Sequence, residues 1–357
     1  MLSKPMIERP TPLTPGTAAV ASPRVRAASL DDVAALAGVS SGTVSRALSR
    51  PEMISEATRQ RVLEAANRIG YVPNGAARAM ALRRTFTVGA VIPRFGTSSF
   101  PTMVQALEAE LAERGYTLLL AAPGNKQNQT EMVRTLIARG VDALVLLGSR
   151  YPQEVIGLLR TQGTPFVRLW TQDDSLGPCV GFDEAQAAAL VIDHLADLGH
   201  HEIGFIGGYT KNNERAEARL SGLTRAVARR GLVLREDATV ETEYGFQEGF
   251  DAMEWIRSGG CPITAVVCGN DYLAAGALAA LDQAGVSVPE QLSVASFNDN
   301  DFAPFLHPPL TTLHLPIKEM GELAARYLVS VLQNQNPQPI ASLPMALKVR
   351  RSTGPRK

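Results

Sequence analysis

The chain has 357 residues, which is too long for one ordinary domain and predicts two or three. Hydrophobic residues make up 45% and charged residues 20%, the composition of an ordinary soluble globular protein, which argues against a disordered or fibrous chain. The formal net charge is zero, but residues 1–84 hold twelve basic and six acidic side chains, so the charge is unevenly spread. A basic N-terminal region on an acidic body predicts a polyanionic partner for that region only.

Residues 1–22 contain Pro and Thr but no continuous apolar core, which argues against a signal peptide or a membrane anchor. We expect a disordered leader over residues 1–28. The cysteines Cys179, Cys261 and Cys268 are odd in number and form no C-x-x-C pair. They predict buried free thiols in a reducing cytoplasm and no metal site.

Residues 29–69 carry the start and stop signals of three short helices. Ser29 precedes two acids, as expected of an N-cap and first turn, and Gly38 lies where that helix must stop. Ser40 can cap a second helix that runs to about Leu48, and Ser55 can cap a third. Two short helices joined by a Gly-containing turn and braced by a third predict a helix-turn-helix.

The second helix opens with small hydroxyl residues, "SSGTVS", and Arg46 follows one turn later. A recognition helix places its N-terminal residues against base edges and phosphates, where small hydroxyls permit close approach. Arg46 has the length to bind a guanine edge through two donors. The spacing alone leaves a second interpretation open, a helical hairpin with a solvated Ser/Thr face.

The segment "TRQRVLEAANRIGYVPNGAARAMAL" closely resembles the one that follows the helix-turn-helix in the LacI/GalR family of bacterial transcriptional regulators. The resemblance implies a hinge helix that folds on DNA and inserts an apolar side chain into the minor groove, with Met80 in the place usually held by Leu. The candidate DNA-binding residues are Ser29, Leu30, Ser40, Ser41, Thr43, Ser45, Arg46, Ser55, Tyr71, Asn74, Ala77 and Met80.

Gly42 departs from the family, which usually has a longer, base-reading residue there. Gly offers no donor or acceptor to a base and weakens a helix by up to about 1 kcal/mol. We therefore expect less of the operator specificity to come from this position.

From Phe86 onward, apolar runs such as "FTVGAVI", "VDALVLL", "IGFIGG" and "LSVASFN" alternate with helical patterns. This alternation predicts parallel sheets with helices on both faces, which bind ligands at the carboxyl ends of their strands. No G-x-G-x-x-G or P-loop follows these strands, so we expect no nucleotide cofactor.

The family resemblance continues from Phe86 to about Arg350, through "HLADLGHHEIGFIGG", "RLSGL", "VVCGNDYLAAGAL" and "PPLTTL". It implies an α/β fold of periplasmic-binding-protein type: an N-terminal helix-turn-helix head plus two doubly wound parallel-sheet subdomains with the effector in the cleft. Three crossovers are expected near Phe182, Pro316 and Leu343. The expected boundaries are 29–74 for the head, 75–85 for the hinge helix and linker, 86–350 for the effector-binding and dimerisation domain, and 351–357 for a tail.

The family's effector contacts map onto Arg219, Asn270 and Asn298, and Trp170 and Asp183 lie on strand ends that line the expected cleft. Arg219 offers two parallel donors to a carboxylate. Asn298 stands where the family usually has Asp, so the repulsion between a fixed carboxylate and an anionic ligand is absent.

Arg94 and Arg168 are expected to add positive charge on the same side, with a solvated rim position as the alternative for each. These residues favour an anionic sugar effector, such as an aldonic or keto-aldonic acid, over a neutral hexose. The fragment "PCVGFDE" also resembles gluconate-type repressors of the family.

The assembled prediction is a cytoplasmic, ligand-responsive transcriptional regulator, most simply a repressor of a sugar or sugar-acid operon. One small head makes too few contacts for specific affinity, so we expect a homodimer on pseudo-palindromic double-stranded operator DNA. The end "RRSTGPRK" has no leucine heptads and predicts no coiled-coil tetramer, and the pair His200–His201 is expected at the surface. The alternative is a cytoplasmic sugar-modifying enzyme with a fused DNA-binding head.

Overall fold

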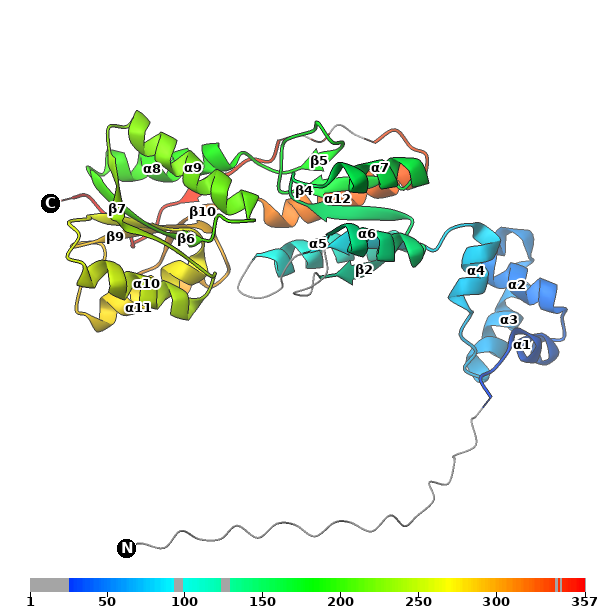
Figure 1. The fold of residues 1–357 in the computed structure, drawn as a ribbon. Helices are drawn as coiled ribbons and strands as arrows, with labels where there is room; N and C mark the ends of the chain where they lie inside the picture. Colours follow the sequence, from blue (N-terminus) through cyan, green and yellow to red (C-terminus); the bar gives the residue numbers. More distant parts are fainter. Residues whose placement is uncertain (1–25, 93–98, 123–128, 338–339, 341, 357) are drawn as a thin grey trace, which may run out of the picture. The chain divides into compact units, whose positions relative to one another are not determined.

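The computed structural model describes residues 26–92, 99–122, 129–337, 340 and 342–356 (Figure 1). The chain divides into two compact units, one ending at Ala81 and the other beginning at Leu82. Arg94 and residues 1–25 of the expected leader lie outside the described residues. Along the described part of the chain, no helix combines the length and apolar character needed to cross a bilayer.

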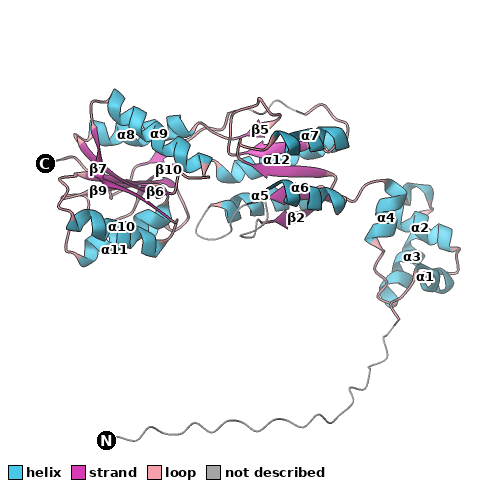
Figure 2. Ribbon diagram, in the orientation of Figure 1, coloured by secondary structure: helices cyan, strands magenta, loops and turns pink. Residues whose placement is uncertain are grey.

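In the described part of the first unit, helices are the only regular secondary structure (Figure 2). Its elements are α1 (Leu30–Ala37), α2 (Ser41–Ser49), the short 3-10 helix η1 (Pro51–Met53), α3 (Glu56–Arg68) and α4 (Gly75–Leu82). Val33, Val44 and Val62, one from each of the first three helices, are fully buried in its core.

Each helix of the head begins and ends where the sequence signals place it. The Ser29 hydroxyl accepts from the Asp32 amide while the Asp32 carboxylate accepts from the Ser29 amide, which is a capping box. Gly38 has a φ of 65°, the left-handed conformation that ends α1. Ser40 caps α2 and Ser55 caps α3, so all three expected N-caps are confirmed.

The second unit contains two sheets. The N-subdomain sheet has the order β2-β1-β3-β4-β5, all parallel, from β1 (Thr87–Val91), β2 (Thr117–Ala121), β3 (Ala143–Leu147), β4 (Phe166–Leu169) and β5 (Cys179–Val180). The C-subdomain sheet has the order β11-β10-β9-β8-β6-β7, from β6 (Glu202–Gly208), β7 (Val233–Thr242), β8 (Ala265–Cys268), β9 (Ser293–Asn298), β10 (Thr311–His314) and the antiparallel β11 (Ala346–Lys348).

Helices cover both faces of each sheet, as Figure 1 shows. On the N-subdomain sheet, α5 (Phe100–Glu113) and α12 (Ile317–Leu332) pack on one face, and α6 (Gln129–Ala138) and α7 (Gln153–Gln162) on the other. On the C-subdomain sheet, α8 (Glu184–Asp197) and α9 (Glu214–Arg229) lie opposite α10 (Phe246–Ser258) and α11 (Asp271–Gln283). Two doubly wound subdomains are therefore confirmed.

The chain passes between the subdomains three times. It leaves the first sheet after Val180, returns to α12 after His314, and reaches β11 from residues 342–345. The three expected crossovers near Phe182, Pro316 and Leu343 are confirmed. Because α12 returns to pack on α5, the N-subdomain is completed only by a segment from the C-terminal part of the chain.

Two expectations about this unit are wrong. The residues expected to form a tail are built into the C-subdomain, because Ser352 and Thr353 are buried and the Ser352 hydroxyl accepts from the Thr311 amide and donates to the Val294 carbonyl. His200 was expected at the surface but is buried between the Thr264 hydroxyl and the Gly354 carbonyl. Burial lowers its pKa.

Of the three thiols expected to be buried, the structure buries only Cys268 fully. Cys179 and Cys261 are partly buried, and all three are free.

The packing of α9 on α8 yields a stability prediction. A Cβ at Gly222 would lie 2.7 Å from the Ala185 Cα, which is backbone and cannot move aside cheaply. Gly222→Ala should therefore lower the free energy of unfolding by about 1–3 kcal/mol, measured by urea denaturation.

Gly157→Ala is the matched control, because Gly157 lies in α7 with nothing within 4 Å of the added Cβ. It should raise stability by about 0.5–1 kcal/mol through helix propensity alone. Equal effects of the two substitutions would contradict the packing argument.

Candidate DNA-binding surface and effector site

The outward side of α2 presents the predicted recognition residues. Gly42, Ser45 and Arg46 are exposed, while Val44 and Ala47 on the opposite side are buried in the head. The amides at the start of α2 are only partly satisfied by the Ser40 hydroxyl, which accepts from the Thr43 amide and contacts the Thr43 hydroxyl at 2.9 Å. An exposed helix N-terminus of this kind favours a phosphate.

Gly42 gives the Arg46 side chain room on this surface. A Cβ built at Gly42 would have only the Ser40 hydroxyl, at 3.8 Å, and the Arg46 Nη2, at 3.9 Å, as neighbours. The guanidinium therefore lies beside the position that the missing side chain would occupy. Ser41 is held by a hydrogen bond from its hydroxyl to the Asp31 carboxylate at 2.5 Å.

The segment after α3 leads into the hinge helix. Tyr71 is half-buried against the head core, and its amide donates to the Ala66 carbonyl. The Asn74 Oδ1 accepts from the amides of Ala76 and Ala77, so Asn74 caps α4. Met80 lies on α4 with 83% of its surface exposed, and Ala77 is exposed on the same helix.

The remaining candidates in the head lie around its helix starts. Ser29 and Leu30, at the start of α1, are partly buried, and Ser55, at the start of α3, is exposed.

A buried ion pair lies where the two subdomains meet. Arg219, on α9, donates from Nε and Nη2 to the two carboxylate oxygens of Glu184, both at 3.0 Å. Its Nη1 donates to the Gly269 carbonyl at 2.6 Å, and its guanidinium carbon lies 4.7 Å from the centre of the Phe297 ring. Arg219 is 5% exposed and Glu184 7% exposed.

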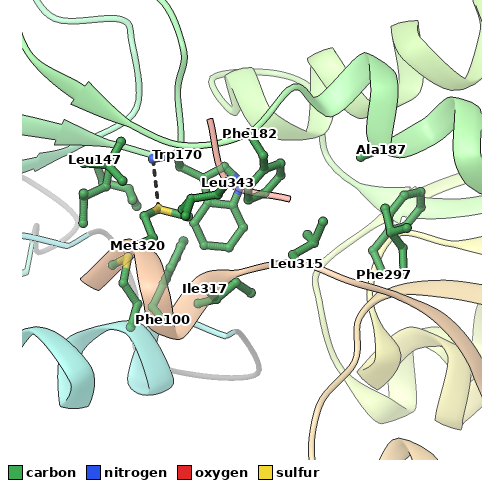
Figure 3. Close-up of a cluster of buried hydrophobic side chains, with 14 of the residues drawn as sticks. Phe100, Leu147, Trp170, Phe182, Ala187, Phe297, Leu315, Ile317, Met320 and Leu343 are labelled. Atoms are coloured by element: carbon green, nitrogen blue, oxygen red, sulfur yellow. Dashed lines mark hydrogen bonds between the residues drawn. The ribbon is translucent and has the colours of Figure 1, made fainter. Parts of the chain in front are cut away.

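Trp170 connects this pair to the N-subdomain. It follows β4 with a φ of 63°, and its indole Nε1 donates to the Glu184 carboxylate at 2.9 Å. Figure 3 shows Trp170 and Phe182 side by side near Met320, whose sulfur accepts from the Trp170 amide, while Phe297 lies on the C-subdomain side. A single hydrogen-bonded chain thus runs from β4 through Glu184 and Arg219 to the end of β8.

The other candidate residues of the C-subdomain lie at strand ends. Asn270 is buried after β8 and its Oδ1 accepts from the Leu273 amide, while Asp183 is exposed and its Oδ1 accepts from two amides of α8. Asn298 ends β9 with a φ of 108°, and its buried Oδ1 has no hydrogen-bond partner among the described residues.

The buried Asp271 carboxylate accepts hydrogen bonds from Thr312 and from Ser296 and Asn300, which lie two residues on either side of Asn298 in the chain. Burial raises its pKa, and these hydrogen bonds oppose that rise.

Arg168 does not face the effector site. Parallel β4 alternates its side chains, so Arg168 shares a face with Phe166, on the side of the sheet covered by α6 and α7. It is fully buried and donates to the carbonyls of Asp173 and Gly177 in the loop before β5. The expected cleft position is wrong, and so is the alternative of a solvated rim residue.

The donor pair of Arg219 is not open to a ligand carboxylate as expected. Glu184 already occupies its Nε and Nη2 donors and balances its charge. Glu184 was not predicted from the sequence, because the family resemblance gave no reason to single it out.

Arg215 is the second residue that the sequence reasoning missed. It lies near the start of α9, and its guanidinium carbon is 5.3 Å from the centre of the Phe100 ring on the N-subdomain helix α5. The spacing of Arg215 and Arg219, four residues apart on one helix, is a signal that places both on the same face.

Each of the two units contains a region that matches a known family of protein domains. Residues 29–74 match the model of bacterial regulatory proteins of the lacI family, and residues 192–353 match a periplasmic binding protein-like domain. The chain is 34% identical over 305 residues to the ribose operon repressor of Escherichia coli, covering 85% of this chain and 92% of that protein. It is 30% identical over 313 residues to the transcriptional repressor PurR of Photobacterium profundum, covering 87% and 93% respectively.

A solved structure of the Lac repressor dimer bound to operator and an anti-inducer is also similar. Its TM-score is 0.81 at 25% identity, and the match covers 92% of this chain and all of that one. Sequence and fold agree over both the head and the two-subdomain body. The chain therefore belongs to the LacI family of bacterial regulatory proteins.

Proposed function

We propose that the protein is a transcriptional repressor that binds a pseudo-palindromic operator as a homodimer in the cytoplasm. A small polyhydroxylated effector, a sugar or sugar acid, binds at the carboxyl ends of the strands in both subdomains and controls the affinity for DNA. The head is residues 29–74, the hinge 75–85, and the effector-binding and dimerisation domain begins at residue 86.

The observation that carries the DNA-binding proposal is the exposed side of α2. Arg46 and Ser45 project from a helix whose other side is buried, beside the small residue Gly42. Arg46 would bind a guanine edge in the major groove, and the opening residues of α2 would contact phosphates. Met80, exposed on α4, would be the apolar wedge in the minor groove.

Exposed apolar side chains on the second unit support the homodimer. Leu119 and Leu120 are 37% and 40% exposed on β2, an edge strand. In the C-subdomain, the rings of Phe246, Tyr272 and Phe302 contact one another, and Phe305 nearby in the chain is 87% exposed. Apolar surface of this extent is usually covered by a partner, and a second copy supplies the matching patch.

The repressor names of the similar proteins support regulation by DNA binding rather than catalysis. The effector proposal rests on the polar groups at the strand ends, above all Asn298, whose buried oxygen lacks a donor among the described residues. A hydroxyl group is a suitable donor for that oxygen.

Arg46→Ala tests the recognition proposal. It should weaken binding to DNA selected from a random pool by about 1–3 kcal/mol and relax discrimination at one base pair, because the bidentate contact is lost. Gel shifts against the selected site and against random duplex measure both effects. An equal loss on the two DNAs would make Arg46 a phosphate contact instead.

Phe305→Asp tests the homodimer. Phe305 is exposed in the monomer, so the substitution should leave folding intact while it weakens dimerisation by about 10- to 100-fold, measured by analytical ultracentrifugation. Val233→Asp, at an exposed apolar position on the edge strand β7, is the control and should dimerise normally. A strictly monomeric wild type, or an unaffected variant, would contradict the assignment.

A further inference from the structure

At the start of α9, Arg215 forms no ion pair with any carboxylate of the described residues. Within the part of the chain that the structure describes, Arg215 makes its ring contact with Phe100 and no hydrogen bond or ion pair. It is partly buried, and burial lowers the pKa of its guanidinium, although an arginine stays charged. A desolvated charge without a partner is unfavourable, and an anion in that position would offset the cost.

The two carboxylates that act electrostatically on Arg215, those of Glu184 and Glu214, both accept hydrogen bonds from other donors. Glu184 is held by Arg219 and Trp170. Glu214, the residue before Arg215, accepts from the Ser149 amide, from the Ser149 hydroxyl at 2.9 Å and from the Arg150 amide at 2.8 Å. The chain therefore supplies two acids beside Arg215 and directs both of them to other donors.

The surroundings place Arg215 between the subdomains. The Phe100 ring and the loop at Gly148 both belong to the N-subdomain, and a Cβ on Gly148 would lie 3.8 Å from the Arg215 Nη1. A Cβ there would also lie 2.1 Å from the Glu214 Oε1, and Gly148 has a φ of 95°, so this position is suited to Gly. The Glu214 carboxylate and the Arg215 guanidinium both lie close to Gly148, but the carboxylate bonds to this loop and makes no ion pair with Arg215 within the described residues.

We propose that the effector carries a single carboxylate and that Arg215 binds it, as the specificity-determining residue of the site. The inference rests on the proposed effector function. Arg219 instead positions Glu184 and the adjoining strand ends. From the sequence, Arg219 was expected to bind the effector carboxylate, but Glu184 occupies its donor pair. In the present proposal Arg215 takes that role.

The local charge favours a monoanion over a phosphate monoester. Arg215, Arg219, Glu184 and Glu214 together carry no net formal charge, so a dianion would meet two cations and two fixed carboxylates, and one of those carboxylates, Glu184, already occupies Arg219. A ligand carboxylate needs only the one open cation. Its hydroxyl groups would meet the polar strand ends, including the Asn298 oxygen.

The test compares matched ligands by titration calorimetry on the full-length protein. Gluconate and galactonate are the acidic probes, glucitol and galactitol are their neutral counterparts, and a hexose phosphate is the dianionic probe. Wild type should bind at least one aldonate about tenfold or more tightly than its alditol. Arg215→Gln should weaken aldonate binding by about 10- to 100-fold and change alditol binding little.

Two further variants distinguish the loss of the Arg215 charge from a general effect on folding. Arg225→Gln alters an exposed arginine on the same helix and should bind all probes as wild type does. Arg215→Lys keeps the charge and should recover part of the aldonate affinity. Thermal unfolding of each variant checks that the effect is on binding.

The inference is overturned if Arg215→Gln binds aldonates as tightly as wild type, if aldonates and alditols bind equally, or if no aldonate binds. The choice of a carboxylate over a phosphate is overturned if the hexose phosphate binds more tightly than the aldonates and Arg215→Gln weakens that binding. Binding of neutral sugars alone, with release of selected DNA, would leave the proposed repressor function standing. Failure of wild type to select any DNA would count against that function itself.

Discussion

The buried ion pair between Glu184 and Arg219 is the interaction on which the two-subdomain body depends. Removing two charges from water is costly, and the cost is met only where the geometry and the remaining hydrogen bonds are favourable. Here both hydrogen bonds between Arg219 and Glu184 are 3.0 Å long. The Glu184 carboxylate also accepts from the Trp170 indole, and the Arg219 Nη1 donates to the Gly269 carbonyl. One cluster therefore ties the end of β4 to the end of β8 and the start of α8.

The same pair fixes the electrostatics of the effector region. Because Glu184 pairs with Arg219, the charge of Arg219 is balanced within the protein. Among the described residues at this position, Arg215 makes no ion pair and is the cation proposed to bind the ligand, while Glu214 is bound by the loop at Ser149. In the proposed site, selectivity between an acid and a neutral sugar would depend on which carboxylates are already paired, rather than on how many arginines lie nearby.

Much of the fold could be predicted from the sequence, because caps, glycine stops and buried strands leave local signals. The caps at Ser29, Ser40 and Ser55 are of this kind, as are the runs that form β1, β3, β6 and β9. The strand β7 gave a weaker signal because "VLREDATVET" is polar and lies at an edge. Helices α7, α10 and α12 were not singled out from the sequence.

The site was less predictable because it depends on pairings between distant residues. Glu184 and Arg219 are 35 positions apart, and Ser149 and Glu214 are 65 apart. Arg168 shows the same limit: its alternation with Val167 and Leu169 indicates a face, but only the packed helices and the loop at Gly177 show that this face is closed. The tail residues Ser352 and Thr353 likewise carry no local mark of burial.

The most direct test of the central claim is a double-mutant cycle on the buried pair. Glu184→Gln, Arg219→Met and the double variant would be compared with wild type by urea unfolding. We expect either single change to cost about 3–5 kcal/mol, because it leaves an unpaired buried group, and the double variant to cost at least about 1.5 kcal/mol less than the sum. Additive losses, within about 0.5 kcal/mol, would contradict the claim that this pair holds the effector region together.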